Sequence, residues 1–296
     1  MGGIPERLSE RLQRAEPIIL DGATGTELER RGVATRLPLW SAGALLRAPA
    51  LVGRIHRDYA GAGAEALTAN TFRTQRRTLA REGLGERAAA LTALAVRLAR
   101  EAAATSASSA LVLGSDPPLE DCYRPDLVPN EAALASEHAE HCANLAAAGV
   151  DAILCETHNS LREACAAARA ASATGLPVLV SFVCWEGATL LSGERLADAV
   201  LAVRTLRPAG LLVNCLPPSN VMACLEVLAG AGLPFGVYAN LGAPDDATGF
   251  RRSEEVTPRQ FAAAAAEWVA AGARLVGGCC GTTPAHIEAI RQSLRP

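Results

Sequence analysis

The chain has 296 residues, of which 50% are hydrophobic, 20% are charged and 4% are aromatic, and its formal net charge is −3. This composition is typical of a globular protein and excludes a disordered chain. The acidic net charge disfavours nucleic acid as a partner, because nucleic-acid-binding domains are usually basic. All 28 basic residues are arginine, so chemistry through a lysine Schiff base is excluded.

The sequence has no pattern of an export signal or a membrane span. The first 17 residues are mostly polar and charged, and no run approaches the roughly 20 apolar residues that a membrane span needs. Nine cysteines are scattered along the chain, which does not resemble the disulfide framework of a small secreted domain. We therefore expect a cytoplasmic protein with reduced thiols and no membrane partner.

Eight short apolar runs recur along the chain, separated by stretches of helical composition. The runs are 17–21, 64–70, 110–116, 151–156, 177–183, 210–215, 234–240 and 274–280, and the clearest helical stretches are 84–104, 131–148 and 161–174. Continuous apolar runs are typical of strands buried on both faces of a parallel sheet. Eight βα units predict an α/β fold, a single (β/α)8 barrel that spans residues 1–296 as one domain. An open, doubly wound sheet is the alternative, and 119–129 and 242–252 are the long expected loops.

Polar residues stand at the C-terminal ends of these runs, where (β/α)8 barrels carry their chemistry. The strand-end residues are Asp21, Asn70, Asp116, Glu156, Ser181 or Cys184, Cys215, Asn240, Cys279 and Cys280. Carboxylates, amides and thiols gathered at one end of a barrel predict a polar active site there.

Three of these strand-end residues are thiols. Cys215 ends the sixth run, and Cys279 and Cys280 end the eighth, where they are too close in sequence for a relaxed disulfide. Three thiolates with one open position would form a catalytic zinc site, and soft ligands select zinc over magnesium or calcium. The alternative is that these cysteines are small apolar residues of the core. That role is expected for the other six, which are Cys122, Cys142, Cys155, Cys165, Cys184 and Cys224.

Two strand-end carboxylates suggest the substrate. Asp21 begins a turn of small residues, Gly22, Ala23 and Thr24, that leads into a helix, and the backbone amides of such a turn can hold a carboxylate. Together with Glu156, the turn would suit a zwitterionic amino acid, and a thiolate-bound zinc ion facing it would imply a thiol substrate. The alternative for Asp21 is a helix N-cap.

Five segments carry a specific resemblance. In chain order they are DGATGTELERRG, LTANTF, LCETH, VNC and GGCCGTTPAHI. Together they resemble the homocysteine S-methyltransferase family over residues 17–294. The resemblance implies a (β/α)8 barrel with zinc on Cys215, Cys279 and Cys280. It further implies that Asp21 and Glu156 hold the amino group of homocysteine, and that the amides of Gly22, Ala23 and Thr24 receive its carboxylate.

The methyl donor is marked less clearly. Trp40 matches an aromatic residue that lies near the onium methyl groups in betaine-dependent relatives, and an indole face attracts cations; a core or lid tryptophan is the alternative. Asn70 is expected to contact substrate. Arg73 stands where betaine-dependent members carry a tyrosine, which disfavours betaine. His158 also departs from the family pattern, and we expect a solvated loop histidine.

The resemblance implies zinc-dependent transfer of a methyl group from an onium donor to the thiolate of L-homocysteine, giving methionine. S-methylmethionine and S-adenosylmethionine are the favoured small-molecule donors. Alternatives are a donor such as betaine, a corrinoid or folate partner protein, and a non-catalytic zinc- or thiol-binding regulator. A metal-dependent hydrolase or aldolase ranks last, because no strand end is rich in histidine.

Overall fold

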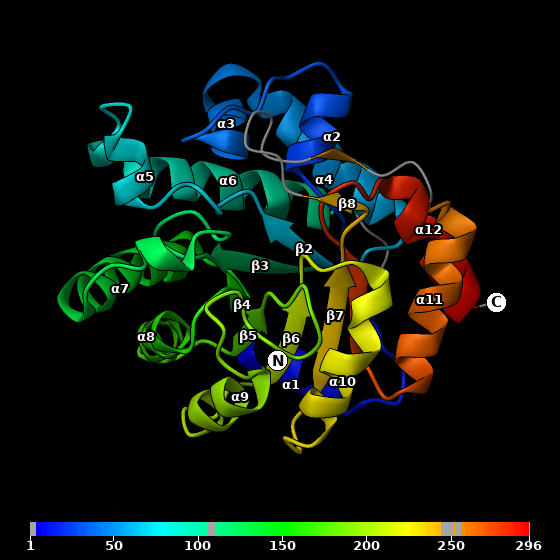
Figure 1. The fold of residues 1–296 in the computed structure, drawn as a ribbon. Helices are drawn as coiled ribbons and strands as arrows, with labels where there is room; N and C mark the ends of the chain where they lie inside the picture. Colours follow the sequence, from blue (N-terminus) through cyan, green and yellow to red (C-terminus); the bar gives the residue numbers. More distant parts are fainter. Residues whose placement is uncertain (1–3, 106–109, 244–250, 253–255, 296) are drawn as a thin grey trace.

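The computed structural model describes residues 4–105, 110–243, 251–252 and 256–295 (Figure 1). Eight parallel strands form one sheet in the order β1-β10-β7-β6-β5-β4-β3-β2. Their bounds are β1 (Ile18–Ile19), β2 (Ala66–Ala69), β3 (Leu111–Asp116), β4 (Ala152–His158), β5 (Val178–Phe182), β6 (Gly210–Asn214), β7 (Phe235–Ala239) and β10 (Leu275–Gly278). A bridge between Leu20 and Ala66 joins the two ends of the sheet, beside a 3.0 Å hydrogen bond from the Asp21 amide to the Ala66 carbonyl. The predicted (β/α)8 barrel is confirmed.

Twelve helices are described, and all but the first, which closes one end, lie outside the ring of strands (Figure 1). They are α1 (Ile4–Gln13), α2 (Gly25–Arg30), α3 (Gly43–Arg47), α4 (Pro49–Ala62), α5 (Arg76–Ala80), α6 (Ala88–Ala103), α7 (Glu131–Ala148), α8 (Leu161–Ser172), α9 (Leu196–Arg204), α10 (Val221–Ala229), α11 (Pro258–Ala270) and α12 (Pro284–Leu294). The three clearest helical stretches of the sequence correspond to α6, α7 and α8. Side-chain caps define some starts: Asn130 accepts from the amide of Ala133 at α7, and Thr257 forms a capping box with Gln260 at α11.

The first helix closes one end of the barrel. Leu8 and Leu12 of α1 belong to the same buried cluster as the inward side chains of the strands, among them Leu113, Leu154 and Leu212. A separate, larger cluster fills the space between the strands and the outer helices. The C-terminal ends of the strands therefore remain as the open end of the barrel. In the part of the chain that the structure describes, no helix is long and apolar enough to cross a membrane.

The two long loops carry short elements of their own. A 3-10 turn at Pro125–Leu127 interrupts the loop at 119–129. In the loop at 242–252, β8 (Gly242–Ala243) pairs antiparallel with β9 (Arg251–Arg252). Residues 244–250 of that loop lie outside the described residues.

Behind β3 and β4 lies a buried polar cluster that corrects two expectations. The carboxylate of Asp116 faces α7 and lies 3.0 Å from Nδ1 of His138, so it points away from the open end of the barrel. His158 is fully buried on β4, and the expectation of a solvated loop histidine is wrong. The reason is a register shift between Cys155 and His158, with Thr157 at φ 61°, which turns the His158 ring toward that of His138, 5.9 Å away.

We predict that Leu8→Ala lowers the free energy of unfolding by about 2–5 kcal/mol, because it removes a side chain that is 1% exposed inside the barrel cluster. Urea denaturation followed by circular dichroism measures the change. The matched control is Leu201→Ala on α9, where the side chain is 61% exposed, and this variant should remain within about 0.5 kcal/mol of the parent. Equal effects of the two substitutions would contradict the docking of α1.

Candidate active site

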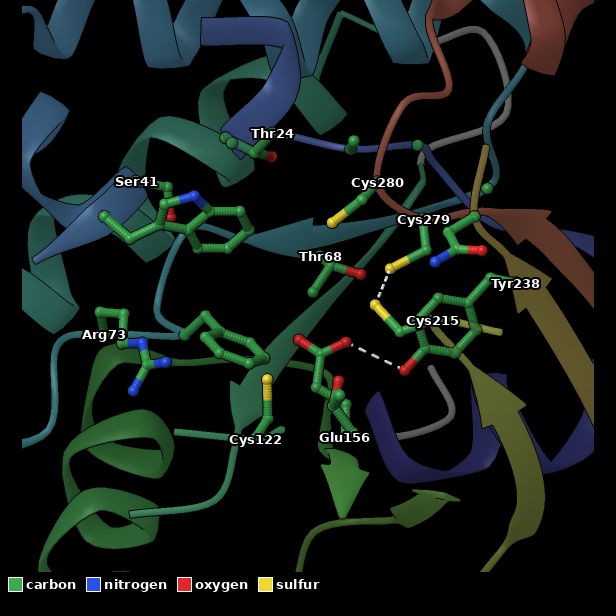
Figure 2. A pocket seen from close by; sticks show the side chains of 18 of the residues that line it. Thr24, Ser41, Thr68, Arg73, Cys122, Glu156, Cys215, Tyr238, Cys279 and Cys280 are labelled. Carbon is green, nitrogen blue, oxygen red and sulfur yellow. Dashed lines mark hydrogen bonds between the residues drawn. The ribbon is translucent and has the colours of Figure 1, made fainter. Parts of the chain in front are cut away.

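A cavity of about 750 Å³ opens at the C-terminal ends of the strands (Figure 2). All ten residues that the sequence analysis selected for the site line it: Asp21, Gly22, Ala23, Thr24, Trp40, Asn70, Glu156, Cys215, Cys279 and Cys280. Asn240 also lines it, whereas Asp116, Ser181 and Cys184 do not. A cavity of this volume is of the size that small-molecule sites have.

Three thiols meet on one wall of the cavity. The sulfur atoms of Cys215, Cys279 and Cys280 all lie within 4.8 Å of one another, and those of Cys215 and Cys279 are 2.6 Å apart (Figure 2). Tetrahedral zinc with three thiolates would hold the sulfur atoms about 3.8 Å apart. The cluster therefore fits a thiophilic ion after a small separation of the closest pair.

Backbone constraints hold the thiols in place. Cys215 adopts a left-handed conformation with φ 53°, which is costly for a residue other than glycine and is concentrated at functional sites. The amide of Cys279 donates to the carbonyl of Ala239 at 2.7 Å, and the carbonyl of Cys280 accepts from the amide of Leu241 at 2.7 Å. The end of β10 is thus tied to the end of β7.

Hydrogen bonding among the thiols shifts their pKa values in opposite directions. Hydrogen bonds from Cys215 and from Cys280 hold the pKa of Cys279 well below that of an ordinary thiol. The hydrogen bond to Cys279 and burial raise the pKa of Cys215. The cluster is already prepared to carry thiolate, which is the form that binds metals.

Two carboxylates face the same cavity. Burial raises the pKa of Asp21 well above its ordinary value, the nearby charge of Glu156 adds to this, and the amide of Thr68, which donates to Oδ2 at 2.9 Å, opposes it. Burial also raises the pKa of Glu156 to about 7. Among the described residues, neither carboxylate forms an ion pair. A cationic ligand group would therefore be stabilised between them.

Two hydroxyl groups orient Glu156. The phenol of Tyr238, on β7, donates to Oε2 at 2.9 Å (Figure 2), and the hydroxyl of Ser115, on β3, donates to Oε1. The next residue, Thr157, is braced by Asn214, whose amide donates to the Thr157 hydroxyl at 2.7 Å and whose carbonyl accepts from the Thr157 amide at 3.1 Å. Hydroxyl groups from β3 and β7 consequently hold the Glu156 carboxylate in one orientation, and β6 braces the residue that follows it.

The turn after β1 depends on the absence of a side chain. A Cβ atom at Gly22 would lie 2.8 Å from both Thr282 and Tyr59. The phenol of Tyr59 donates to the carbonyl of Ala23 at 2.9 Å, and the amide of Ala23 donates to the Thr282 hydroxyl at 3.3 Å. The turn is thus fixed against α4 and the segment before α12, with its backbone at the cavity wall.

Aromatic rings cover the thiols. Trp40, Tyr123 and Trp185 pack against the cluster that contains Cys215 and Cys280. The Tyr123 and Trp185 ring centroids are 5.1 Å apart, and the indole of Trp185 donates to the Cys215 carbonyl at 3.1 Å. Such a set of π faces next to sulfur can hold a cation without strong hydrogen bonds.

The Trp40 ring lies directly on a glycine. A Cβ atom at Gly25 would come within 2.4 Å of the Trp40 ring. Trp40 also meets the ring of Phe72 edge-on, with centroids 5.9 Å apart. Its indole is therefore positioned between the turn after β1 and the loop after β2, at the cavity wall.

Comparisons with known proteins identify the family of the chain. The family model described as homocysteine S-methyltransferase matches residues 18–294. A homocysteine S-methyltransferase of Escherichia coli (strain K12) is 35% identical over 304 residues, which cover 95% of this chain and 96% of that protein. The chain belongs to the homocysteine S-methyltransferase family. The resemblance found in the sequence motifs is confirmed, and family membership makes the protein an enzyme that transfers a methyl group to homocysteine.

Further members of the family support the assignment. Homocysteine S-methyltransferase YbgG of Bacillus subtilis (strain 168) is 31% identical, with coverage of 92% of this chain and 93% of that protein. The crystal structure of the homocysteine methyltransferase MmuM from Escherichia coli in its metallated form matches with a TM-score of 0.84 and 32% identity, covering 98% of this chain and 99% of that one. The similarity therefore extends to the whole barrel.

The sequence analysis of this methyltransferase missed several cavity residues. They are Phe72, Cys122, Tyr123, Trp185 and Tyr238. The sequence could have indicated Tyr238, because it stands two residues before the strand-end residue Asn240. Side chains two residues apart in a strand point to the same face of the sheet. The others lie in loops after strands, where no repeating pattern of apolar residues predicts the direction of a side chain. Cys122 is buried as expected, but it is also a cavity residue.

We predict that this methyltransferase binds one Co²⁺ ion per chain with strong sulfur-to-metal charge-transfer absorption, because three thiols converge on one point. Cys279→Ala should lose that absorption. The matched control is Cys165→Ala on α8, a cysteine that does not line the cavity and should leave the spectrum unchanged. Undiminished absorption in Cys279→Ala would mean that Cys279 is not a ligand, and absence of the absorption in the parent would mean that the three cysteines are only small apolar residues.

Proposed function

We propose that the protein uses zinc and an onium donor, with S-methylmethionine or S-adenosylmethionine preferred, to methylate L-homocysteine to methionine. The observation that carries the proposal is the convergence of three thiols, two buried carboxylates and several aromatic rings in one cavity. These groups are complementary to the metal, to the ammonium of an amino acid and to the onium cation of a donor, respectively.

In this proposal the carboxylates of Asp21 and Glu156 hold the ammonium group of homocysteine. Tyr238 and Ser115 keep Glu156 in position. The substrate carboxylate is assigned to the turn after β1. Because the amide of Ala23 already donates to Thr282, the amides of Gly22 and Thr24 are the proposed donors.

Cys215, Cys279 and Cys280 would hold the zinc ion. Their soft sulfur donors suit zinc better than magnesium or calcium, and three ligands leave one coordination position open. When bound, zinc would lower the pKa of the homocysteine thiol, which is otherwise mostly protonated at neutral pH. Asn214 and the bonds between the ends of β10 and β7 keep the three cysteines convergent.

The methyl transfer itself needs no general base from the protein. The homocysteine thiol gives its proton to solvent, and a sulfur lone pair then forms the new bond to the methyl carbon. The bond between that carbon and the donor sulfur breaks, and its electron pair stays on the donor, which leaves as a neutral thioether. Trp40, Tyr123 and Trp185 orient the onium group and exclude water from the reacting atoms.

The direct test is methionine formation by the zinc-loaded protein from L-homocysteine and S-methylmethionine. Turnover is expected. Cys280→Ser should abolish both turnover and the binding of one zinc ion per chain. Cys165→Ser on α8 serves as the control and should retain both. Activity of a Cys280→Ser protein that keeps its zinc would overturn the assignment of the ligands. Turnover with betaine alone would overturn the donor preference.

We predict that L-methionine, a ligand without a titrating thiol, binds the metal-free protein more weakly as the pH falls through 7. Below that pH the Kd should rise about tenfold per pH unit, because burial raises the pKa of Glu156 to about 7 and a protonated Glu156 must lose its proton before it pairs with the ammonium group. Isothermal titration calorimetry between pH 5.5 and 8.5 measures the profile.

Two variants separate Glu156 from other titrating groups. Glu156→Gln should weaken binding at pH 8 and remove the component of the profile centred near pH 7. Glu82→Gln, an exposed glutamate in the loop after α5, should leave the profile unchanged. A Glu156→Gln protein with the parent profile would assign the ammonium group elsewhere.

A further inference from the structure

Arg73, in the loop after β2, is a buried cation in the wall of the cavity. Its side chain lines the cavity although the residue is only 7% exposed. Nη1 donates to the carbonyl of Glu120 at 3.1 Å, and the guanidinium lies 5.3 Å from the Phe72 ring centroid. The buried Nε has no hydrogen-bond partner. Part of the donor capacity of the guanidinium is therefore unused.

No carboxylate of the described residues lies within ion-pair distance of Arg73. Other arginines of the chain are paired: the half-buried Arg100 binds Asp151 through two nitrogens, and the more exposed Arg295 binds Glu65 in the same way. A buried charge without a counter-ion is costly, and arginine forms its strongest bonds with carboxylates and phosphates. The place of Arg73 in a ligand cavity thus indicates an anionic ligand group.

Arg73 lies on the side of the cavity that is proposed for the methyl donor. In Figure 2 it stands across the pocket from Cys215 and Tyr238. Its neighbour Phe72 contacts the ring of Trp40, one of the aromatic residues assigned to the onium group. The carboxylate of homocysteine is assigned to a different element, the turn after β1. The anionic group that reaches Arg73 therefore belongs to the second substrate.

We propose that Arg73 binds a carboxylate of the methyl donor and so selects sulfonium donors that carry a carboxylate, such as S-methylmethionine. This inference rests on the proposed function. The guanidinium offers Nε and its terminal nitrogens to the carboxylate, while the sulfonium end extends toward the aromatic rings beside the thiols. The ion pair fixes the distance and orientation of the transferable methyl group.

The test compares S-methylmethionine with its carboxamide, which keeps the sulfonium and the amino group but lacks the carboxylate. Arg73→Met should raise the KM for S-methylmethionine roughly ten- to a hundredfold, as expected for loss of a charge-assisted contact. It should leave the KM for homocysteine and the kinetics with the carboxamide within about threefold of the parent. Arg73→Lys, which keeps a charge, should recover part of the loss.

Arg124→Met is the matched control. Arg124 also lines the cavity, but it pairs with Asp126 through two nitrogens, at 2.8 and 2.6 Å. A general effect of positive charge on the donor would appear in both variants, whereas the proposed contact predicts donor discrimination in Arg73→Met alone. Equal losses with the two donors would assign Arg73 a structural role. A raised KM for homocysteine would assign it to the acceptor.

Calorimetric titration of S-methylmethionine into the zinc-loaded protein without homocysteine measures the same contact in the absence of turnover. A Kd at least tenfold higher for Arg73→Met than for the parent supports the inference, and equal Kd values overturn it. Absence of turnover in the presence of both substrates would contradict the proposed function instead. The two failures are therefore distinguishable.

Discussion

Burial of ionisable and nucleophilic groups that have no counter-ion among the described residues is the constraint on which this site depends. Among the described residues, Asp21 and Glu156 face the cavity with no cationic side chain to pair with, and Arg73 has no carboxylate beside it. Three thiols also converge on one point of the cavity wall. Such groups destabilise a folded chain. The closed barrel and its continuous outer core tolerate them, and a ligand with complementary charges relieves them.

The strained backbone of the molecule is concentrated at the same place. Four non-glycine residues in the described part of the chain have positive φ, and three of them, Trp40, Thr157 and Cys215, line the cavity. Asn214 braces Thr157 and directly precedes Cys215, so two of the three strained residues adjoin one another at the ends of β4 and β6. The strain at Thr157 also has a structural effect, because it lets Glu156 face the cavity while His158 turns outward. Preorganisation of the site is thus obtained through locally unfavourable conformations.

Much of the fold and the polar half of the site could be predicted from the sequence. Parallel strands that close into a barrel bring their C-terminal ends to one edge, so strand-end residues such as Asp21, Glu156 and Cys215 had to meet. The family motifs then gave these residues proposed roles. His158 was placed wrongly, because the bulge in β4 leaves no mark in the pattern of apolar residues. The orientation of Arg73 and Trp185 depends on loop packing, which sequence period does not encode.

The position of α1 has a kinetic consequence. Since Leu8 and Leu12 fill the far end of the barrel, the described residues leave the cavity open at the C-terminal ends of the strands, and the exposed Leu37 lies among its lining residues. Two substrates that both enter from this end would do so in sequence. The amino acid seated between Asp21 and Glu156 would enter first, and a donor bound beside Arg73 and the aromatic rings would then block its exit. The architecture thus favours productive turnover when the acceptor binds first, with the spent donor leaving before the methylated product.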